Sequence, residues 1–246
     1  MSHRWLSPVV AVLLFTQPHF APAQDLQTSP HAEGVSPETA GDLLFARGEF
    51  VEALDAYSRA PVDAATLNKI GVVWQHLSAV EQAKHNYEEA LALRPNFPDA
   101  LNNLGAVYFA EKKYTQAIRL YRRALELAPD SPITTANLGT AYFAQGRTSQ
   151  GVEAYRTAFS LDSSVFDPDS ASLVEGPLSD EGRARLDYSI AELFAQMHRN
   201  DRALDYLRRA FDAGFEDSKR LWQDPAFAEL RITADFAALT AQYHLK

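Results

Sequence analysis

The sequence predicts an all-α fold, a solenoid built from antiparallel helix pairs. The first observation is a fixed internal period, because Gly71, Gly105 and Gly139 lie 34 residues apart in similar local sequences. A period of this size is typical of stacked helical repeats. The second observation concerns the half of each unit that follows the glycine, where three positions recur at the spacing of one helix face. Each unit is therefore interpreted as two helices joined by a turn.

The second helix of each unit carries a small residue, an aromatic residue four positions later and an alanine three positions after that. These residues are Ala83, Tyr87 and Ala90, then Ala117, Tyr121 and Ala124, and then Gly151, Tyr155 and Ala158. Small residues let two helices approach closely, and an aromatic ring fills the space that remains. Gly105 is therefore expected at a helix crossing that has no room for a side chain. Gly146 is expected in a turn, where a side chain is tolerated.

Proline residues mark the borders of these units. Pro95 and Pro129 end the second helices. Pro98 begins the next first helix, and Ser131 is the expected N-cap before Pro132.

The third unit resembles the tetratricopeptide repeat family. The residues that carry the resemblance are Leu101, Leu104, Gly105, Tyr108, Ala117, Tyr121, Ala124 and Pro129. The resemblance implies a right-handed superhelical solenoid whose first helices line a concave, partner-binding face. The resemblance is specific because three copies of the motif follow one another at the same 34-residue period.

Weaker copies of the motif flank these three units. The four predicted repeats before the break in register cover 34–63, 64–97, 98–131 and 132–165, so that residues 34–165 form four helix pairs. Pro61 is expected to shorten the second helix of the first repeat. Residues 166–183 are interpreted as a loop insert, either looped out at the binding face or simply tolerated at the surface. Residues 184–217 form the fifth repeat, with alanine in place of the usual glycine.

The C-terminal segment 218–246 is predicted to be a helical cap. Helix starts at Asp224-Pro225 and at Thr233 interrupt an apolar pattern that includes Trp222 and Phe236. The segment resembles a tail that follows the last repeat in bacterial tetratricopeptide proteins. Closing the open end of the solenoid is the preferred role, and an exposed partner-binding patch is the alternative.

The N-terminus has the layout of a secretory signal peptide. A basic Arg4, an apolar stretch and the Ala21-Pro22-Ala23 site predict a signal peptide at 1–23 and cleavage before Gln24. Residues 24–33 are then a flexible lead-in, and the protein is expected to be exported, periplasmic or secreted. The apolar stretch is too short to span a bilayer, and the chain has no cysteine for a lipid or a disulfide. No stable membrane anchor is expected.

Composition and motifs argue against several classes of function. The formal net charge of -9 disfavours nucleic acid as a partner, because binding phosphates depends on Lys and Arg. The sequence contains no metal-binding His-Glu-x-x-His, no phosphate-binding glycine-rich loop and no Gly-x-Ser-x-Gly motif. We therefore expect no catalytic residue, no metal and no cofactor, and interpret the chain as not an enzyme. The oligomeric state is left open.

The resemblance places the candidate partner-binding residues on the first helices of the second, third and fourth repeats. They are Asn68, Lys69, Gln75, Asn102, Asn103, Phe109, Asn137, Thr140 and Phe143. Asn103 and Asn137 are expected one above the other, with Lys69 as the preceding rung. The asparagines either bind the backbone of an extended peptide or bond between adjacent helices. The phenylalanines either anchor a ligand or complete packing between consecutive first helices.

The resulting hypothesis is a non-catalytic protein-interaction scaffold of the cell envelope that binds a peptide or protein partner in its concave groove. The alternative is a docking or accessory subunit for a cell-envelope hydrolase or a secretion or assembly machine.

Overall fold

The computed structural model describes residues 35–166 and 180–245, and all regular structure in these two ranges is helical. Ten of the helices form five pairs: α1 (Pro37–Ala46) with α2 (Phe50–Ser58), α3 (Ala64–His76) with α4 (Val80–Leu93), α5 (Pro98–Ala110) with α6 (Tyr114–Leu127), α7 (Pro132–Ala144) with α8 (Thr148–Leu161), and α9 (Asp180–Gln196) with α10 (Asn200–Asp212). The remaining elements are a 3-10 turn η2 (Ser163–Phe166) and a C-terminal group of α11 (Ser218–Gln223), η3 (Pro225–Phe227), η4 (Leu230–Ile232) and α12 (Ala234–Gln242).

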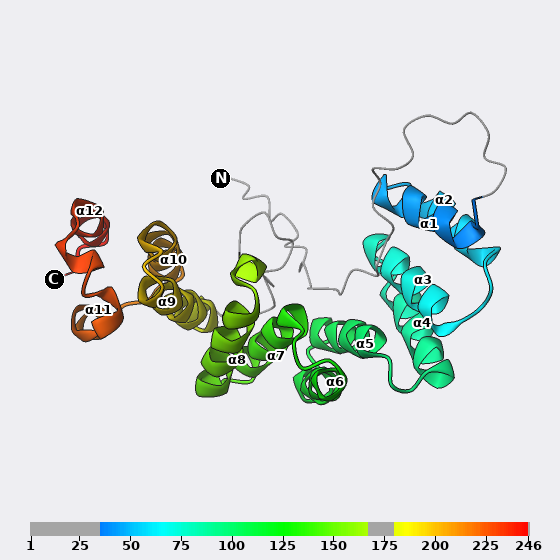
Figure 1. Ribbon diagram of the computed structural model, residues 1–246. Coiled ribbons are helices and arrows are strands. Elements are labelled where there is room, and N and C mark those ends of the chain that lie inside the picture. The colour runs from blue at the N-terminus through cyan, green and yellow to red at the C-terminus, as the bar shows by residue number, and fades with distance from the viewer. Residues whose placement is uncertain (1–34, 167–179, 246) are drawn as a thin grey trace, which may run out of the picture.

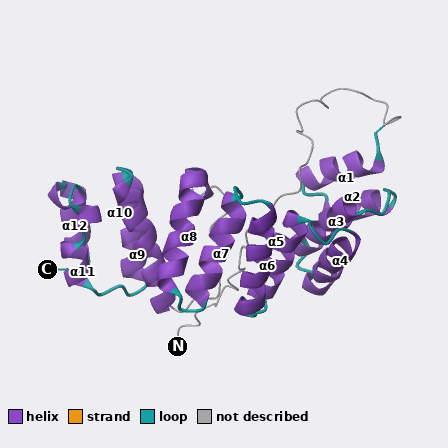
Figure 2. Cartoon of the chain, turned by 60° about the horizontal axis from the view of Figure 1, so that its bottom comes forward, coloured by secondary structure: helices purple, strands orange, loops and turns teal. Residues whose placement is uncertain are grey.

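The helix pairs are stacked side by side into a curved array. Figure 1 shows the chain passing from α1 and α2 at one end, through an arc, to α11 and α12 at the other. In this view α3 and α5 lie on the inner side of the arc, and their partners α4 and α6 lie on the outer side. Figure 2 shows the same succession of pairs from a second direction. The expected all-α, right-handed solenoid of antiparallel helix pairs is confirmed.

The helix borders follow local sequence signals. The helix α5 begins at Pro98, and α7 begins at Pro132, where the Ser131 hydroxyl accepts a hydrogen bond from the Thr134 N–H at 3.3 Å. The helix α2 has 9 residues, whereas α4 has 14, since Pro61 follows α2 closely. A proline ring has no N–H to donate and clashes with the preceding turn.

In each of the first four pairs, a glycine on the first helix packs against a tyrosine on the second. The four pairs are Gly41 with Tyr57, Gly71 with Tyr87, Gly105 with Tyr121 and Gly139 with Tyr155. A methyl group added at Gly105 would lie only 2.7 Å from Tyr121 Cε1, closer than real side chains approach. The expected lack of room at Gly105 is confirmed. The ring of each tyrosine fills the volume that the missing side chain leaves.

The turn inside each pair contains one residue in the left-handed region. The residues at this position are Gly48, Ser78, Lys112, Gly146 and His198. Gly146 has a φ of 73°, and an added methyl group would meet no atom within 4 Å. Its predicted place in a turn is confirmed.

The junction between the fourth and fifth pairs differs from the expected boundaries of the 166–183 insert. Residues 167–179 lie outside the described residues. Phe166 is fully buried and packs against Tyr155 and Phe159, with ring centroids 5.1 and 5.8 Å away. The helix α9 already begins at Asp180, where acidic residues in the first turn match the helix dipole.

The C-terminal elements pack onto the last pair. Their buried apolar residues belong to the same core as the fourth and fifth pairs, and they are Leu221, Phe227, Leu230, Phe236 and Leu239. Asp224 accepts a hydrogen bond from the Ala226 N–H, and Thr233 accepts one from the Phe236 N–H. The predicted helix starts at these two positions thus have the expected capping contacts.

The segments predicted as signal peptide and lead-in, residues 1–23 and 24–33, lie outside the described residues. Export therefore remains a prediction. Within the ranges that the structure describes, no helix combines the length and the hydropathy needed to span a membrane.

Candidate partner-binding face

The sequence-predicted binding residues lie on three successive first helices. Asn68, Lys69 and Gln75 come from α3, Asn102, Asn103 and Phe109 from α5, and Asn137, Thr140 and Phe143 from α7. All of them are buried except Gln75, which is half-buried. The structure brings four of them, Asn68, Asn102, Asn103 and Asn137, together as one polar column that crosses the second, third and fourth pairs.

Four asparagine side chains in this column form a continuous chain of hydrogen bonds. Asn137 Nδ2 donates to Asn102 Oδ1 at 2.9 Å, which links α7 to α5. Asn102 Nδ2 donates to the neighbouring Asn103 Oδ1 at 3.2 Å. Asn103 Nδ2 donates to Asn68 Oδ1 at 3.1 Å, which links α5 to α3. The structure therefore shows the inter-helix alternative for the asparagines. Peptide binding by the same amides remains a prediction.

The asparagines that bond to one another are not the ones that were expected to be stacked. Asn103 and Asn137 were expected to stand one above the other, but each inter-helix bond joins residues 35 positions apart. The side chain three residues before one glycine therefore meets the side chain two residues before the next glycine. A stagger of this kind follows when successive first helices are displaced along their axes by about one residue, about 1.5 Å.

Lys69 makes an ion pair instead of a rung in the asparagine chain. Its Nζ lies 2.8 Å from Asp42 Oδ1 and 2.7 Å from Glu38 Oε1, both on α1. Tyr57 Oη donates to Asp42 Oδ1 at 2.8 Å. Burial alone would lower the pKa of Lys69, but its hydrogen bonds to Asp42 and Glu38 outweigh burial and raise it.

Sequence reasoning did not assign Asp42 and Glu38. The available signal was their position, since Glu38 lies three residues before Gly41 and Asp42 one residue after it. These are the same positions that were assigned to the groove in the later repeats. The first repeat therefore extends the polar column with charged groups.

Gln75 and Thr140 form hydrogen bonds with the hydroxyl groups of tyrosines on the second helices. Tyr87 Oη donates to Gln75 Oε1, and Thr140 Oγ1 lies 2.6 Å from Tyr155 Oη. Burial raises the pKa of both tyrosine hydroxyls, which keeps them protonated and available as donors. Each of these contacts joins the two helices of its own pair.

Phe109 and Phe143 pack in the core. The Phe109 ring lies 5.3 Å from the Tyr114 ring, and the Phe143 ring lies 5.3 Å from the Tyr155 ring. Gly151 provides room for Phe143, because an added methyl group would lie 2.6 Å from Phe143 Cδ2. The structure thus supports the packing alternative, although these contacts join the two helices of one pair rather than consecutive first helices. Ligand contact by the rings remains a prediction.

The arrangement offers no constellation for metal chemistry in the part of the chain that the structure describes. There, no three His, Cys, Asp or Glu side chains gather closely enough to hold a metal ion. The column consists mainly of carboxamides, which donate and accept hydrogen bonds but do not transfer protons near neutral pH.

Comparison with known protein families finds similarity to tetratricopeptide repeats in three overlapping or adjacent segments. Residues 98–131 and 136–164 match models described as "Tetratricopeptide repeat", and residues 78–111 match a model described as "TPR repeat". No curated protein sequence matches the chain.

Solved structures with the same fold include two bacterial proteins. A structure titled "Functional Characterization of Pseudomonas Aeruginosa pilF" is 19% identical and has a TM-score of 0.55, with 85% of this chain and 87% of that chain covered. "MamA 41-end from Desulfovibrio magneticus RS-1" is 20% identical and has a TM-score of 0.50, with 76% and 95% covered. Repeat solenoids of this type present extended concave binding surfaces. The chain therefore folds as a solenoid of the tetratricopeptide-repeat type, and its repeats support a role as a protein-interaction scaffold.

Proposed function

We propose that this scaffold is exported to the cell envelope and binds an extended peptide, or an extended segment of a protein partner, along its concave face. The observation that carries the proposal is the polar column on α3, α5 and α7. It runs unbroken across three helix pairs, and two of its helices, α3 and α5, lie on the inner side of the arc in Figure 1.

The chemistry of the column suits a peptide backbone. A carboxamide has two N–H donors and a carbonyl with two lone pairs, which match the groups of a peptide backbone, although the four asparagines are buried in the unbound chain. Bonds to the backbone give affinity with little demand on the partner's sequence. The bonds between Asn68, Asn102, Asn103 and Asn137 also hold the amides in fixed orientations, which lowers the entropy that binding costs.

Site-specific photo-crosslinking tests the location of the site. A photoreactive amino acid is placed at Ala110 or Ala144, each five residues after its glycine on a first helix, and Ala110 is exposed. The control position is the exposed Arg122 on the outer helix α6. We expect Ala110 and Ala144 to crosslink to the same partner and Arg122 not to do so. Crosslinking from Arg122 alone would contradict binding in the groove.

Export is tested separately. The signal-peptide layout of residues 1–23 motivates it, and sequencing the N-terminus of protein from its native host is expected to give Gln24. Intact Met1 on cytoplasmic protein would contradict export. The crosslinked partner then separates a general peptide-binding scaffold from the alternative, a docking subunit of an envelope hydrolase or a secretion or assembly machine.

A further inference from the structure

The outer helices of the second and third pairs carry opposite charges at the same place. In the second pair, the residues 17 and 18 positions after the glycine are Glu88 and Glu89, and in the third pair they are Arg122 and Arg123. All four residues are exposed. Since α4 and α6 both lie on the outer side of the arc (Figure 1), this reversal of charge lies on the convex face, away from the polar column.

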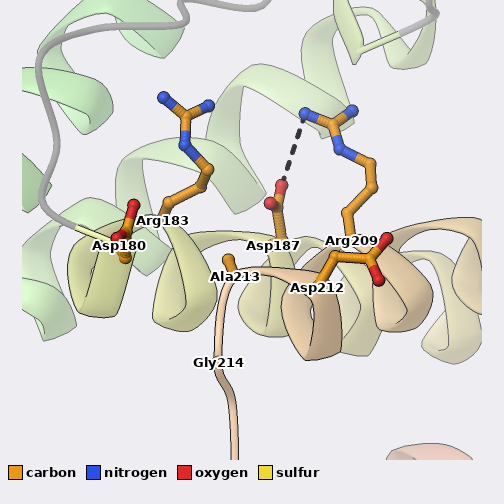
Figure 3. A pocket seen from close by; sticks show the side chains of 7 residues that line it. All are labelled: Asp180, Arg183, Asp187, Arg209, Asp212, Ala213 and Gly214. Carbon is orange, nitrogen blue, oxygen red and sulfur yellow. Dashed lines mark ion pairs between the residues drawn. The ribbon is translucent and has the colours of Figure 1, made fainter. Parts of the chain in front are cut away.

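In the fourth and fifth pairs, the arginines at this place have acidic partners within the chain. Arg156 Nη1 on α8 lies 3.3 Å from Glu153 Oε2. In the fifth pair, Arg209 Nη2 on α10 lies 3.6 Å from Asp187 Oδ1, and Figure 3 shows the two groups facing each other. The positive charges of these two pairs are therefore balanced locally.

The arginines of α6 lack such acidic partners. Three residues before Arg122, where α8 has Glu153, α6 has another arginine, Arg119. In the part of the chain that the structure describes, Arg119 and Arg122 make no hydrogen bond or ion pair, and neither does Glu88 on α4. Like charges one turn apart on a helix are unfavourable. Departures from local consistency of this kind are expected at functional sites.

A second copy of the chain supplies the missing partners. Residues 34 positions apart lie at equivalent heights on α4 and α6, because these are the second helices of consecutive repeats. A two-fold axis parallel to the two helices and midway between them places α4 of each copy over α6 of the other. Glu88 of each copy then faces Arg122 of the other, so the contact forms twice. Glu89 and Arg119 add one further charge of the matching sign to each side.

Apolar residues near the ends of the two helices extend the same face. Leu93 and Leu127 are exposed, and they too lie 34 positions apart. Each follows a residue of the charged pair by four positions, which places it on the same side of its helix. The two-fold axis therefore brings Leu93 of one copy toward Leu127 of the other.

The reversal of charge at exactly one repeat makes this face complementary to itself, which favours a second copy over an unrelated protein. Two convex surfaces touch over a small area, and such an interface is weak and transient. We propose that the chain forms a weak two-fold dimer through the outer faces of α4 and α6, held by two Glu88–Arg122 ion pairs between the copies.

The test measures self-association of the full chain by analytical ultracentrifugation. At about 0.1 M salt, a Debye length of about 10 Å screens the repulsion between two acidic chains but leaves close ion pairs. We expect a monomer–dimer equilibrium with a Kd of about 0.1 mM under these conditions. At about 1 M salt, where the Debye length is about 3 Å, dimerisation should weaken about tenfold. A chain that stays monomeric at about 1 mM protein in the lower salt, or a Kd that does not change with salt, would overturn the proposal.

Charge exchange identifies the face. Glu88→Arg with Glu89→Arg makes α4 basic, and Arg119→Glu with Arg122→Glu makes α6 acidic. Each variant alone places like charges opposite each other and is expected to lose affinity for itself by about tenfold or more. An equimolar mixture of the two is expected to form a heterodimer, because each α4 then faces the opposite charge. A chain that carries all four changes should dimerise like the natural chain. Unchanged self-association of either variant, or no association in the mixture, would contradict the two-fold arrangement.

A matched control changes the same amount of charge elsewhere. Arg156→Glu with Arg208→Glu replaces two exposed arginines that pair within the chain, and is expected to leave the dimer Kd unchanged. An equal loss of affinity in this control would attribute the effect to net charge and refute the assignment of the face. In the groove crosslinking experiment, a product of Arg122 with twice the mass of the chain is this dimer and not a captured groove partner. The dimer and the groove function can therefore fail independently.

Discussion

The second to fourth helix pairs and the fifth pair solve the same packing problem with different residues. In the earlier pairs, a glycine on the first helix meets a tyrosine 16 positions later, as in Gly105 with Tyr121. In the fifth pair the corresponding residues are Ala191 and Leu207, again 16 positions apart and both fully buried. A larger residue on one helix is thus matched by a smaller one on the other. The fold demands a constant combined volume rather than a particular residue.

The two regions also differ in how their polar groups are used. Neutral carboxamides connect the first helices of the second, third and fourth pairs, whereas charged groups connect the fifth pair to the C-terminal elements. Glu192 Oε1 accepts a hydrogen bond from Arg220 Nη2 at 3.0 Å, and Tyr188 Oη donates to Asp224 Oδ2 at 3.1 Å. These contacts join α9 to the C-terminal elements. The regular repeats therefore depend on close packing, and the end of the array adds electrostatic interactions that vary with pH.

The largest expected effect comes from overfilling a regular pair. Gly105→Leu introduces a side chain where even a methyl group would lie 2.7 Å from the Tyr121 ring. The expected loss in the free energy of unfolding is about 3 kcal/mol or more. Gly146→Asn is the control, because asparagine tolerates the left-handed turn conformation and the position is open. Chemical denaturation that gave equal losses for both variants would contradict the packing difference.

A double variant sharpens the comparison between the two kinds of pair. Gly105→Ala combined with Tyr121→Leu gives the third pair the two residues that the fifth pair has. We expect the combination to cost about 1 kcal/mol less than the sum of the single changes, because each relieves the other. Strict additivity in the denaturation free energies would show that the volumes are not coupled.

The second effect concerns the asparagine chain. Asn102→Ala removes the bond to Asn137 and the bond to Asn103 at a site that is fully buried. We expect the free energy of unfolding to fall by about 2–3 kcal/mol. Asn86→Ala, whose exposed amide bonds only to the Gln82 carbonyl of its own helix, is the control and should cost less than about 0.5 kcal/mol. An Asn102→Ala variant with an unchanged free energy of unfolding would show that the hydrogen bonds between the asparagines do not stabilise the fold.

A smaller, pH-dependent effect is expected at the end of the array. Burial and a hydrogen bond with Asp224 raise the pKa of Glu192 to about 7. A carboxyl whose folded pKa is raised stabilises the protein below its unfolded pKa, and this contribution is lost as pH rises through the folded pKa. Glu192→Gln remains neutral, so its stability relative to the natural chain should increase by about 1–2 kcal/mol between pH 5 and pH 8. Thermal melts at the two pH values measure the difference, and a constant offset would contradict the shifted pKa.

The sequence predicted the regular part of this molecule well because its signals are local and periodic. The glycine and tyrosine positions, the proline borders and the turn at Gly146 all follow from spacing within one or two helices. The burial of Phe166 was not predicted, because a single aromatic residue after α8 has no periodic partner in the sequence. Its core contacts depend on where the fifth pair packs.

The candidate site was predicted less completely than the fold. Spacing placed Asn102, Asn103 and Asn137 on one face, but it did not give the stagger between helices that determines which amides meet. The pairing of Lys69 with Asp42 depends on a contact between α1 and α3, 27 residues apart in sequence.

The smallest expected effect compares two turns that share one geometry. Lys112 and Gly146 occupy the same position in consecutive repeats, with φ values of 60° and 73°. A lysine in the left-handed region costs about 1–2 kcal/mol, and glycine avoids this strain while losing some conformational entropy on folding. Lys112→Gly is therefore expected to stabilise the chain by about 0.5–1 kcal/mol, whereas Gly146→Ala should destabilise it by a similar amount. The exposed Lys112 has no core contact to lose, so equilibrium denaturation measures the backbone effect directly. Opposite signs for the two variants would show that this turn position favours glycine in both repeats, and a loss of stability in Lys112→Gly would contradict it.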